Sequence, residues 1–427
     1  MSQLLYTLAI VALLPWALAH LLWRARRQPA YLRHWGERFG FYSAVSPAPT
    51  FWLHAVSVGE TRAAQPLVAA LKARYPDHRI LLTHMTPTGR ATSEDLFGDA
   101  VTRVYLPYDT PWAVRRFLRH FQPSIGLIME TELWPNLIAA CRTRQIPLLL
   151  VNARLSARSA RRYGRFPNLT QAALTQLAAI SAISADDAAR LRALGAPDVS
   201  VSGSVKFDVT PPTPLPDFRA RIGQRPVFLC ASTREGEEAL ILDEWQKVGA
   251  GGTASAGSAA LMETALLIIV PRHPQRFDEV ASLITARGLK LQRRLDEQPV
   301  AADTQVWLGD SMGEMFAYHA AADVVFVGGS LLDFGCQNLI EPCAVGAPVL
   351  IGPSTFNFAE AARGALKAGA AIQVGSAVEL VTQALALLAD ASRRSTMAAA
   401  GLEFTTQHRG ATERTMTLIE GFIPAGR

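Results

Sequence analysis

Cysteine is scarce in this sequence, and its spacing does not suggest a metal site. The four cysteines, Cys141, Cys230, Cys336 and Cys343, form no CxxC pair and no other metal-ligand spacing. We therefore expect ordinary buried thiols in a reducing compartment.

Two common nucleotide-binding motifs are also missing. The sequence contains neither GxGxxG nor GxxxxGK[ST], which argues against NAD binding and P-loop hydrolysis. Charged residues make up only 18% of the chain and hydrophobic residues 49%, so a disordered chain is excluded. The net charge of +6 would suit nucleic acid, a membrane surface or an anionic substrate, and does not choose between them.

Charge is absent from one long stretch near the start. From Leu4 to Trp23 the only titratable groups of note are Tyr6 and His20, and about twenty helical residues just cross a bilayer core. The preceding residues lack the basic charge of a secretory signal. A group of arginines follows, comprising Arg24, Arg26, Arg27, Arg33 and Arg38. We expect residues 1–27 to be a retained membrane anchor with a basic collar on the cytoplasmic side, or a helix lying in the interface.

The rest of the chain is long enough for two domains, because single cores rarely grow beyond about 250–300 residues. Short apolar runs alternate with amphipathic segments on both sides of a proline-rich stretch, which predicts two parallel α/β sheets. We expect a first domain at 28–208, a hinge at 209–217 and a second domain at 218–427. Residues 249–260 contain only Gly, Ala, Ser and Thr, a composition that predicts a surface loop. The predicted strands are 51–56, 79–83, 101–106, 125–129, 147–151, 178–183, 199–201, 227–231, 265–270, 304–308, 324–327 and 348–351.

Glu60 lies just after the first predicted strand and Gly59, where a helix begins. Ligands bind at the carboxyl ends of strands in open α/β sheets, so this carboxylate is a catalytic candidate. The alternative is a first-turn glutamate that complements the helix dipole.

Other strands of the first domain also end in polar residues. They are followed by Thr83–Gly89, by Glu130-Thr131-Glu132 and by Asn152-Ala153-Arg154. Helix capping would explain any one of these, whereas the set favours a site. Lys206 lies just before the hinge, where it could meet an anion or remain a solvated surface lysine.

The second domain has glycine-containing turns after its strands. Arg272 and His273 follow one strand, Gly309–Met315 another and Gly328-Gly329-Ser330 a third. Backbone amides at such turns bind anions, which predicts a site for a nucleotide mono- or diphosphate. A helix is expected near Gln337, with Glu341 about one turn in, where a carboxylate could accept from ribose hydroxyls or complement the dipole.

Together these motifs, in this order, resemble the 3-deoxy-D-manno-octulosonic acid (Kdo) transferase family. The residues that carry the resemblance are His54–Glu60, Glu130–Asn136, Val151–Ser156, Gly203–Asp208, Arg272–Pro274, Met312–Glu314 and Asn338–Pro342. The resemblance implies a GT-B architecture of two Rossmann-like domains facing a cleft. It also implies an inverting transfer of Kdo from CMP-Kdo to a lipid A precursor at the cytoplasmic face of the inner membrane.

The resemblance also assigns residues. It implies Glu60 as the general base and Glu130 and Lys206 as catalytic residues that assist the transition state. It implies that the reaction needs no metal and no cofactor, which agrees with the absence of an Asp-x-Asp motif. It also implies contacts to CMP from two further sets of residues. These are Pro271, Arg272, Met312, Gly313 and Glu314, and then Asn338, Leu339, Ile340 and Glu341.

Two positions depart from the family pattern. Arg234 and Gln337 both stand where relatives commonly have histidine, which affects the expected donor contacts but not the reaction class. The alternatives are a nucleotide-sugar 2-epimerase, another lipid-directed GT-B transferase that uses a UDP-sugar, and an inactive membrane-tethered nucleotide- or lipopolysaccharide-binding protein. No nucleic-acid partner is expected, because no aromatic stacking platform is evident.

Overall fold

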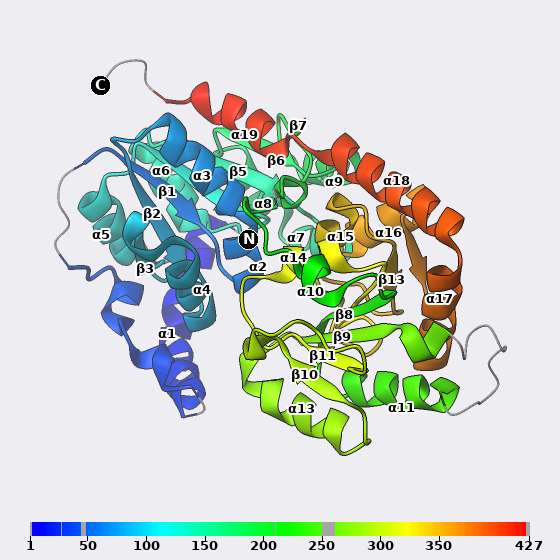
Figure 1. The fold of residues 1–427 in the computed structure, drawn as a ribbon. Helices are drawn as coiled ribbons and strands as arrows, with labels where there is room; N and C mark the ends of the chain where they lie inside the picture. The colour runs from blue at the N-terminus through cyan, green and yellow to red at the C-terminus, as the bar shows by residue number, and fades with distance from the viewer. Residues whose placement is uncertain (1, 27, 44–47, 210, 250–260, 424–427) are drawn as a thin grey trace. The chain divides into compact units, whose positions relative to one another are not determined.

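The computed structural model describes residues 2–26, 28–43, 48–209, 211–249 and 261–423. Most of the predicted loop at 249–260 therefore lies outside the described residues, as do Arg27 of the predicted collar and Thr210 of the predicted hinge. The chain divides into two compact units, each built on a seven-stranded sheet (Figure 1). The predicted pair of Rossmann-like domains is confirmed.

The sheet of the first unit has the strand order β3-β2-β1-β4-β5-β6-β7, and all its pairs are parallel. The order changes direction between β1 and β4, which is where ligands collect in doubly wound sheets. The strands are β1 (Thr50–His54), β2 (Arg79–His84), β3 (Thr102–Tyr105), β4 (Ile125–Met129), β5 (Leu148–Ala153), β6 (Ala179–Ala182) and β7 (Ser200–Val201).

Helices cover both faces of this sheet because its side chains alternate between two apolar clusters. Trp52 of β1 packs with Phe117 and Ile138 on one face, while Phe51 and Leu53 pack in the cluster on the other. Proline at the first helical position begins several of these helices, where its missing N–H costs nothing. The helices are α2 (Val58–Ala63), α3 (Gln65–Arg74), α4 (Pro87–Phe97), α5 (Pro111–Phe121), α6 (Pro135–Thr143), α7 (Ala157–Tyr163), α8 (Pro167–Leu174) and α9 (Ala185–Ala193).

The C-terminal helix α19 (Ala411–Glu420) belongs to the first unit, whereas the sequence analysis placed everything after residue 218 in the second domain. Met416 and Ile419 complete the apolar cluster under β1. Arg74 of α3 pairs with Glu413 at 2.8 Å and with Glu420 at 2.6 Å. Sequence order alone does not reveal this return, because α19 is an ordinary amphipathic helix.

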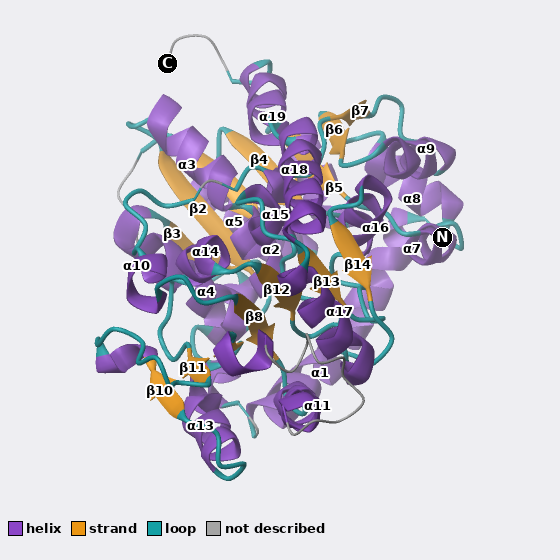
Figure 2. Cartoon of the chain, turned by 45° about the vertical axis from the view of Figure 1, so that its right-hand side comes forward, coloured by secondary structure: helices purple, strands orange, loops and turns teal. Residues whose placement is uncertain are grey.

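The second unit has the order β10-β11-β9-β8-β12-β13-β14, again all parallel, with helices on both faces (Figure 2). Two short edge strands, β10 and β14, were not predicted. The strands are β8 (Val227–Thr233), β9 (Leu266–Pro271), β10 (Leu291–Arg293), β11 (Val306–Leu308), β12 (Val324–Val327), β13 (Val349–Ile351) and β14 (Ala371–Gln373). The helices are α10 (Phe218–Ile222), α11 (Glu237–Gly249), α13 (Phe277–Thr285), α14 (Met315–Ala321), α15 (Ile340–Ala344), α16 (Ala359–Ala368), α17 (Ala377–Ala389) and α18 (Ala391–His408).

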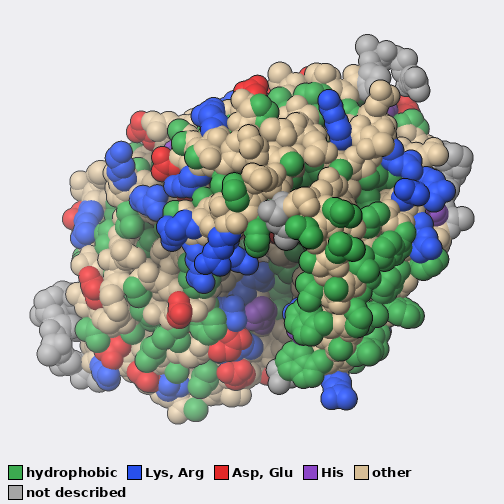
Figure 3. All heavy atoms as spheres, turned by 180° about the vertical axis from the view of Figure 1, so that it is seen from behind, with side chains coloured by type: hydrophobic (Ala, Val, Ile, Leu, Met, Phe, Trp, Pro, Cys, Tyr) green, Lys and Arg blue, Asp and Glu red, His purple; other side chains and the backbone are tan. Residues whose placement is uncertain are grey.

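The N-terminal helix α1 (Gln3–Ala25) is, within the described residues, the one helix long and apolar enough to cross a membrane, with a mean hydropathy of 1.9. Its large apolar side chains are exposed, among them Leu8, Leu13 and Trp16. Hydrophobic side chains also gather at the lower right of the face drawn in Figure 3. These features are compatible with a membrane anchor and do not by themselves establish one.

The prediction that Arg38 belongs to the basic collar is wrong. Arg38 is buried, lies over the ring of Tyr105 at 4.1 Å and donates to the carbonyl of Met85 at 3.1 Å. A guanidinium can stack on an aromatic ring while its N–H groups are satisfied inside the protein. Arg38 therefore stabilises the first unit and does not face a membrane.

Candidate active site

Glu60 occupies the first turn of α2, directly after β1. Ser57 caps this helix, and its Oγ accepts from the Glu60 N–H at 3.4 Å. In return the Glu60 carboxylate accepts from the Val56 N–H at 2.6 Å and from the Ser57 hydroxyl at 3.1 Å. Glu60 thus lies in the first turn of the helix, where it can complement the helix dipole, the alternative that the sequence left open. Its chemistry depends on what surrounds the carboxylate.

Burial, followed by the negative charge of Glu130, raises the pKa of Glu60 to about 7. The hydrogen bonds from Val56 and Ser57 lower that pKa and do not offset burial. Only 9% of Glu60 is exposed, so water solvates its charge poorly. A carboxylate that gains and loses a proton near neutral pH has the acidity suited to a general base.

Hydrogen bonds from residues of β2 and of the start of α4 hold the turn that carries Glu60 in place. His84 Nδ1 lies 2.8 Å from the Ala55 carbonyl oxygen, and the Thr86 hydroxyl donates to the Val56 carbonyl at 3.1 Å. Burial lowers the pKa of His84 to about 4, so its imidazole is neutral at physiological pH. Within the predicted polar segment Thr83–Gly89, these two residues therefore position the Glu60 turn.

Glu130 and Lys206 lie together. Glu130 follows β4, next to β1, in a left-handed conformation with φ of 57° that is uncommon for a side chain of this kind. Its Oε1 lies 3.1 Å from Lys206 Nζ. About three quarters of each side chain is buried, so the pair is shielded from solvent. The structure therefore brings two of the predicted catalytic residues into direct contact, with Glu130 electrostatically coupled to the third, Glu60.

Asn152 explains why Lys206 reaches this edge of the sheet. Asn152 lies near the end of β5, again with a positive φ of 52°, and its Oδ1 accepts from the Val205 N–H at 3.2 Å. Val205 opens the short 3-10 helix η4 (Val205–Phe207) that carries Lys206. The predicted polar end of this strand therefore positions the lysine.

Glu132 is a member of the cluster to which sequence reasoning gave no role. Burial, followed by the charge of Glu130, raises the pKa of Glu132 to about 7. The charge of Glu132 also contributes to the raised pKa of Glu60. The sequence feature that could have indicated Glu132 is the pair of carboxylates, Glu130 and Glu132, that follows one predicted strand. Three carboxylates that interact with one another, and one lysine paired with Glu130, form the carboxylate cluster of the first unit.

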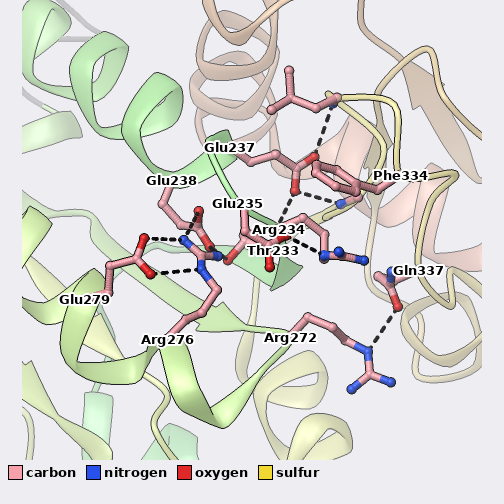
Figure 4. A network of polar contacts seen from close by, with 12 residues as sticks. Thr233, Arg234, Glu235, Glu237, Glu238, Arg272, Arg276, Glu279, Phe334 and Gln337 are labelled. Carbon is pink, nitrogen blue, oxygen red and sulfur yellow. Dashed lines mark hydrogen bonds and ion pairs between the residues drawn. The ribbon is translucent and has the colours of Figure 1, made fainter. Parts of the chain in front are cut away.

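In the second unit, Pro271 ends β9 and Arg272 follows it. The Arg272 N–H bonds the Thr233 carbonyl at 3.0 Å, and its Nε donates to Gln337 Oε1 at 3.2 Å (Figure 4). Arg234, the other departure, lies over the Phe334 ring at 4.3 Å and donates to Glu235 at 2.9 Å. Gln337 therefore takes part in positioning Arg272.

The segment Met312-Gly313-Glu314 precedes α14. Met312 is 59% exposed, and Gly313 has φ of 81°, a conformation in which a side chain would be strained. Glu314 pairs with Arg294 at 2.8 Å and accepts from the Ser311 hydroxyl. The turn is thus held at both sides while Met312 remains accessible.

The helix expected near Gln337 begins three residues later, at Ile340. Asn338 causes this, because its Oδ1 accepts from the Ile340 N–H at 3.0 Å while its Nδ2 donates to Glu341 at 2.9 Å. Leu339 and Ile340 are buried as whole residues, so the structure exposes neither of them to a ligand.

A buried polar network that the sequence analysis did not assign supports this region (Figure 4). Glu237 accepts from the N–H groups of Gly329 at 2.7 Å and Leu331 at 2.9 Å, which fixes the glycine turn after β12. Glu238 pairs with Arg276 at 2.7 and 3.1 Å and accepts from the Thr233 hydroxyl at 2.7 Å. The sequence feature that could have indicated this network is the pair of adjacent glutamates, Glu237 and Glu238.

Among the residues that the structure describes, no group of three or more His, Cys, Asp or Glu side chains could hold a metal ion. Groups of the second unit that can bind an anion are the Arg272 guanidinium and the backbone amides at its glycine turns.

Comparison with known proteins identifies the family. Residues 33–209 match the family model described as 3-deoxy-D-manno-octulosonic-acid transferase (kdotransferase). The 3-deoxy-D-manno-octulosonic acid transferase of Bordetella pertussis is 45% identical, over 99% of this chain and all of the relative. The enzyme of that name from Haemophilus influenzae is 36% identical, over 99% of each chain.

Solved structures show the same fold at low identity. A putative UDP-N-acetylglucosamine 2-epimerase from Listeria monocytogenes is 16% identical, with a TM-score of 0.57 over 88% of this chain and 97% of that one. The UDP-GlcNAc 2-epimerase from Neisseria meningitidis is 15% identical, with a TM-score of 0.57 over 87% and 100%. These likenesses establish the GT-B type of fold alone. Full-length identity of 45% to a named relative decides the family: the chain belongs to the 3-deoxy-D-manno-octulosonic acid transferases and is a glycosyltransferase.

Proposed function

We propose that this enzyme transfers Kdo from CMP-Kdo to the lipid A precursor lipid IVA, with Glu60 as the general base. The observation that carries the proposal is the Glu60 carboxylate, buried after a central strand and with its pKa raised to about 7. The donor and acceptor follow from the family resemblance. The enzyme acts at the cytoplasmic face of the inner membrane, with α1 as its anchor.

The proposed reaction is a single displacement. The acceptor hydroxyl oxygen forms a bond to the anomeric carbon of Kdo, and the bond from that carbon to the CMP phosphate oxygen breaks. CMP leaves with the electron pair of the broken bond, and the configuration of the anomeric carbon inverts. Glu60 takes the hydroxyl proton as the oxygen attacks, which requires the ionised carboxylate.

Lys206 supplies positive charge near the donor's carboxylate or phosphate, where negative charge grows as CMP departs. Glu130, at 3.1 Å from Lys206, orients the ammonium group. The role of Glu130 is therefore to position Lys206, and its charge also keeps the Glu60 pKa high.

CMP binds to the second unit through the residues that match the family's nucleotide segments. Arg272, held by Gln337, neutralises the phosphate with its guanidinium group, together with backbone amides of Met312–Glu314, while Pro271 lies beside it at the end of β9. Asn338 and the Glu341 carboxylate bind the nucleoside, with Glu341 accepting from ribose hydroxyls, while Leu339 and Ile340 pack beneath them. We propose that neither a metal nor a cofactor takes part.

Glu60→Gln tests the proposal. We expect a loss of transfer of about 10²–10⁴-fold, the usual contribution of a general base, with CMP binding retained. CMP release and the mass of the lipid product are measured for both proteins with CMP-Kdo and lipid IVA. The matched control is Glu94→Gln, which alters an exposed glutamate of α4 in the same unit.

Unchanged turnover in Glu60→Gln would exclude the role given to Glu60. Release of UDP from a UDP-sugar, with no turnover of CMP-Kdo, would favour a different donor. Loss of activity in a chelator would contradict the metal-free reaction.

A further inference from the structure

Four arginines gather on one exposed helical segment of the first unit that the proposed reaction does not use. Arg158, Arg161 and Arg162 lie on α7, and Arg165 follows that helix. Together they line a cavity of about 590 Å³. A cavity of this size accommodates a ligand larger than a free phosphate ion.

None of the four guanidinium groups forms an ion pair with a carboxylate within the described part of the chain. Three other arginines of the first unit, Arg74, Arg90 and Arg190, do form ion pairs with carboxylates. Four adjacent positive charges repel one another, so an anion would relieve a cost that the protein otherwise bears. Guanidinium groups bind phosphate through two parallel N–H bonds, which makes phosphate the favoured anion.

The surroundings of α7 indicate where that phosphate comes from. Tyr163, within the arginine cluster, donates to the Thr131 carbonyl at 3.4 Å, between Glu130 and Glu132 of the carboxylate cluster. Tyr163 also lies close enough to Tyr6 of α1 for the two phenols to interact electrostatically. The helix that carries three of the arginines is therefore linked through Tyr163 to the segment of the candidate catalytic carboxylates and to the apolar helix.

The apolar helix is itself attached at the same place. Tyr6 donates to Asp109 at 2.9 Å and Thr7 donates to Asn136 at 2.8 Å. Asp109 in turn accepts from the N–H groups of Asn136 and Leu137 at the start of α6. A lipid that approaches along α1 would thus bring its polar head to the arginine cluster.

We propose that Arg158, Arg161, Arg162 and Arg165 form a binding site for a phosphate ester carried by a lipid. If the proposed function holds, the ligand is a phosphate group of the acceptor glycolipid, which the site positions for attack by its hydroxyl. Phosphate groups of the surrounding bilayer offer the same chemistry, and the experiment separates the two sources.

The test variant is Arg161→Gln with Arg165→Gln in the full-length protein. The control is Arg142→Gln with Arg144→Gln, which removes the same charge from exposed positions at the end of α6. A charge-retaining variant, Arg161→Lys with Arg165→Lys, tests the forked geometry of arginine. Thermal melting shows that each variant is folded.

Two readouts are measured. One is the KM for the phosphorylated acceptor and for the same acceptor after removal of its phosphates. The other is flotation with phosphatidylcholine vesicles that contain or lack phosphatidylglycerol. For an acceptor-phosphate site we expect KM to rise about tenfold for the phosphorylated acceptor only, with kcat, the KM for the sugar nucleotide and flotation unchanged. The lysine variant should recover part of the loss.

A loss of phosphatidylglycerol-dependent flotation, with equal effects on both acceptors, would support the lipid-phosphate site and assign it to the bilayer. Unchanged KM values and flotation, or equal effects in the control, would overturn the proposal. If wild-type protein transfers no Kdo, the proposed function fails, and the flotation comparison alone then decides for or against the arginine site.

Discussion

Two groups of buried carboxylates, one in each unit, differ in the number of hydrogen-bond donors that they receive. In the second unit, Glu237 receives four backbone N–H bonds and Glu238 is matched by the guanidinium of Arg276. In the first unit, Glu60 receives one backbone N–H and one hydroxyl, and no hydrogen bond within the described residues reaches the Glu132 carboxylate.

The difference teaches how to separate a structural carboxylate from a reactive one. Donors that saturate a buried carboxylate fix the surrounding backbone and offset part of the rise in pKa that burial causes, as the N–H groups around Glu237 do. A buried carboxylate with few donors and negative neighbours keeps its proton up to neutral pH, which makes it available for proton transfer. The carboxylate cluster of the first unit is of the second kind, and the Glu237–Glu238 network is of the first.

Breaking the saturated network should have the largest effect on stability. Arg276→Met leaves the Glu238 carboxylate buried without its ion pair, and we expect a loss of about 3–5 kcal/mol in the free energy of unfolding. Urea unfolding of the full-length protein measures it.

The matched control is Arg287→Met, whose partner Asp243 is half exposed, and which should cost less than about 1 kcal/mol. The double variant Glu238→Met with Arg276→Met should recover much of the loss, because no charge remains buried. Equal losses for Arg276→Met and the control would contradict the structural role of the network.

Neutralising the reactive carboxylate should instead stabilise the protein. The pKa of Glu60 is about 7 in the folded protein and about 4.5 as the ordinary value, so the folded state holds this proton more tightly than the unfolded chain. The stability associated with Glu60 is therefore greatest below about pH 4.5 and is lost as the pH rises to about 7. Above pH 7 the penalty is about 2–3 kcal/mol.

Glu60→Gln removes this penalty while its amide oxygen can still accept from Val56. We expect a gain of about 1–3 kcal/mol at pH 8 and little change at pH 5. Urea unfolding at both pH values measures it, with Glu94→Gln as the control. A loss of stability at pH 8 would mean that the charged form of Glu60 is stabilised by the fold.

Most of the fold could be predicted because strands buried on both faces appear as continuous apolar runs. Ile125–Met129 and Val324–Val327 have the predicted bounds, whereas β10 and β14 lack an apolar run and were missed. The position of α19 in the first unit depends on contacts between residues more than 300 positions apart, which no local pattern carries.

The candidate site was predictable in its residue types but not in its energetics. Strand-end positions indicated Glu60 and Glu130, and the family resemblance indicated Lys206. The structure brings Glu130 and Lys206 within 3.1 Å of each other. The raised pKa values of Glu60 and Glu132 come from burial by the folded chain, which sequence spacing does not encode. The prediction that Arg38 belongs to the basic collar was wrong for a similar reason, because the burial of Arg38 over the Tyr105 ring depends on tertiary packing.

The smallest effect tests whether the three carboxylates act as one cluster. Glu132→Gln removes a negative charge that helps to raise the Glu60 pKa, so Glu60 should ionise at lower pH. In the proposed reaction the ionised base is the active form, so the fall in kcat/KM on the acid side should move to slightly lower pH. The gain in kcat/KM should be less than about twofold and greatest near pH 7, where Glu132 itself ionises. The charge of Glu130 raises the Glu60 pKa more than that of Glu132 does, so Glu130→Gln should move this limb further. It should also lower the plateau, because Lys206 loses the carboxylate proposed to position it. The pH profile of transfer for the two variants measures both. An unchanged acid limb in Glu132→Gln would show that Glu132 titrates independently of the base, and that Glu60 and Glu130 alone set the proton affinity of the site.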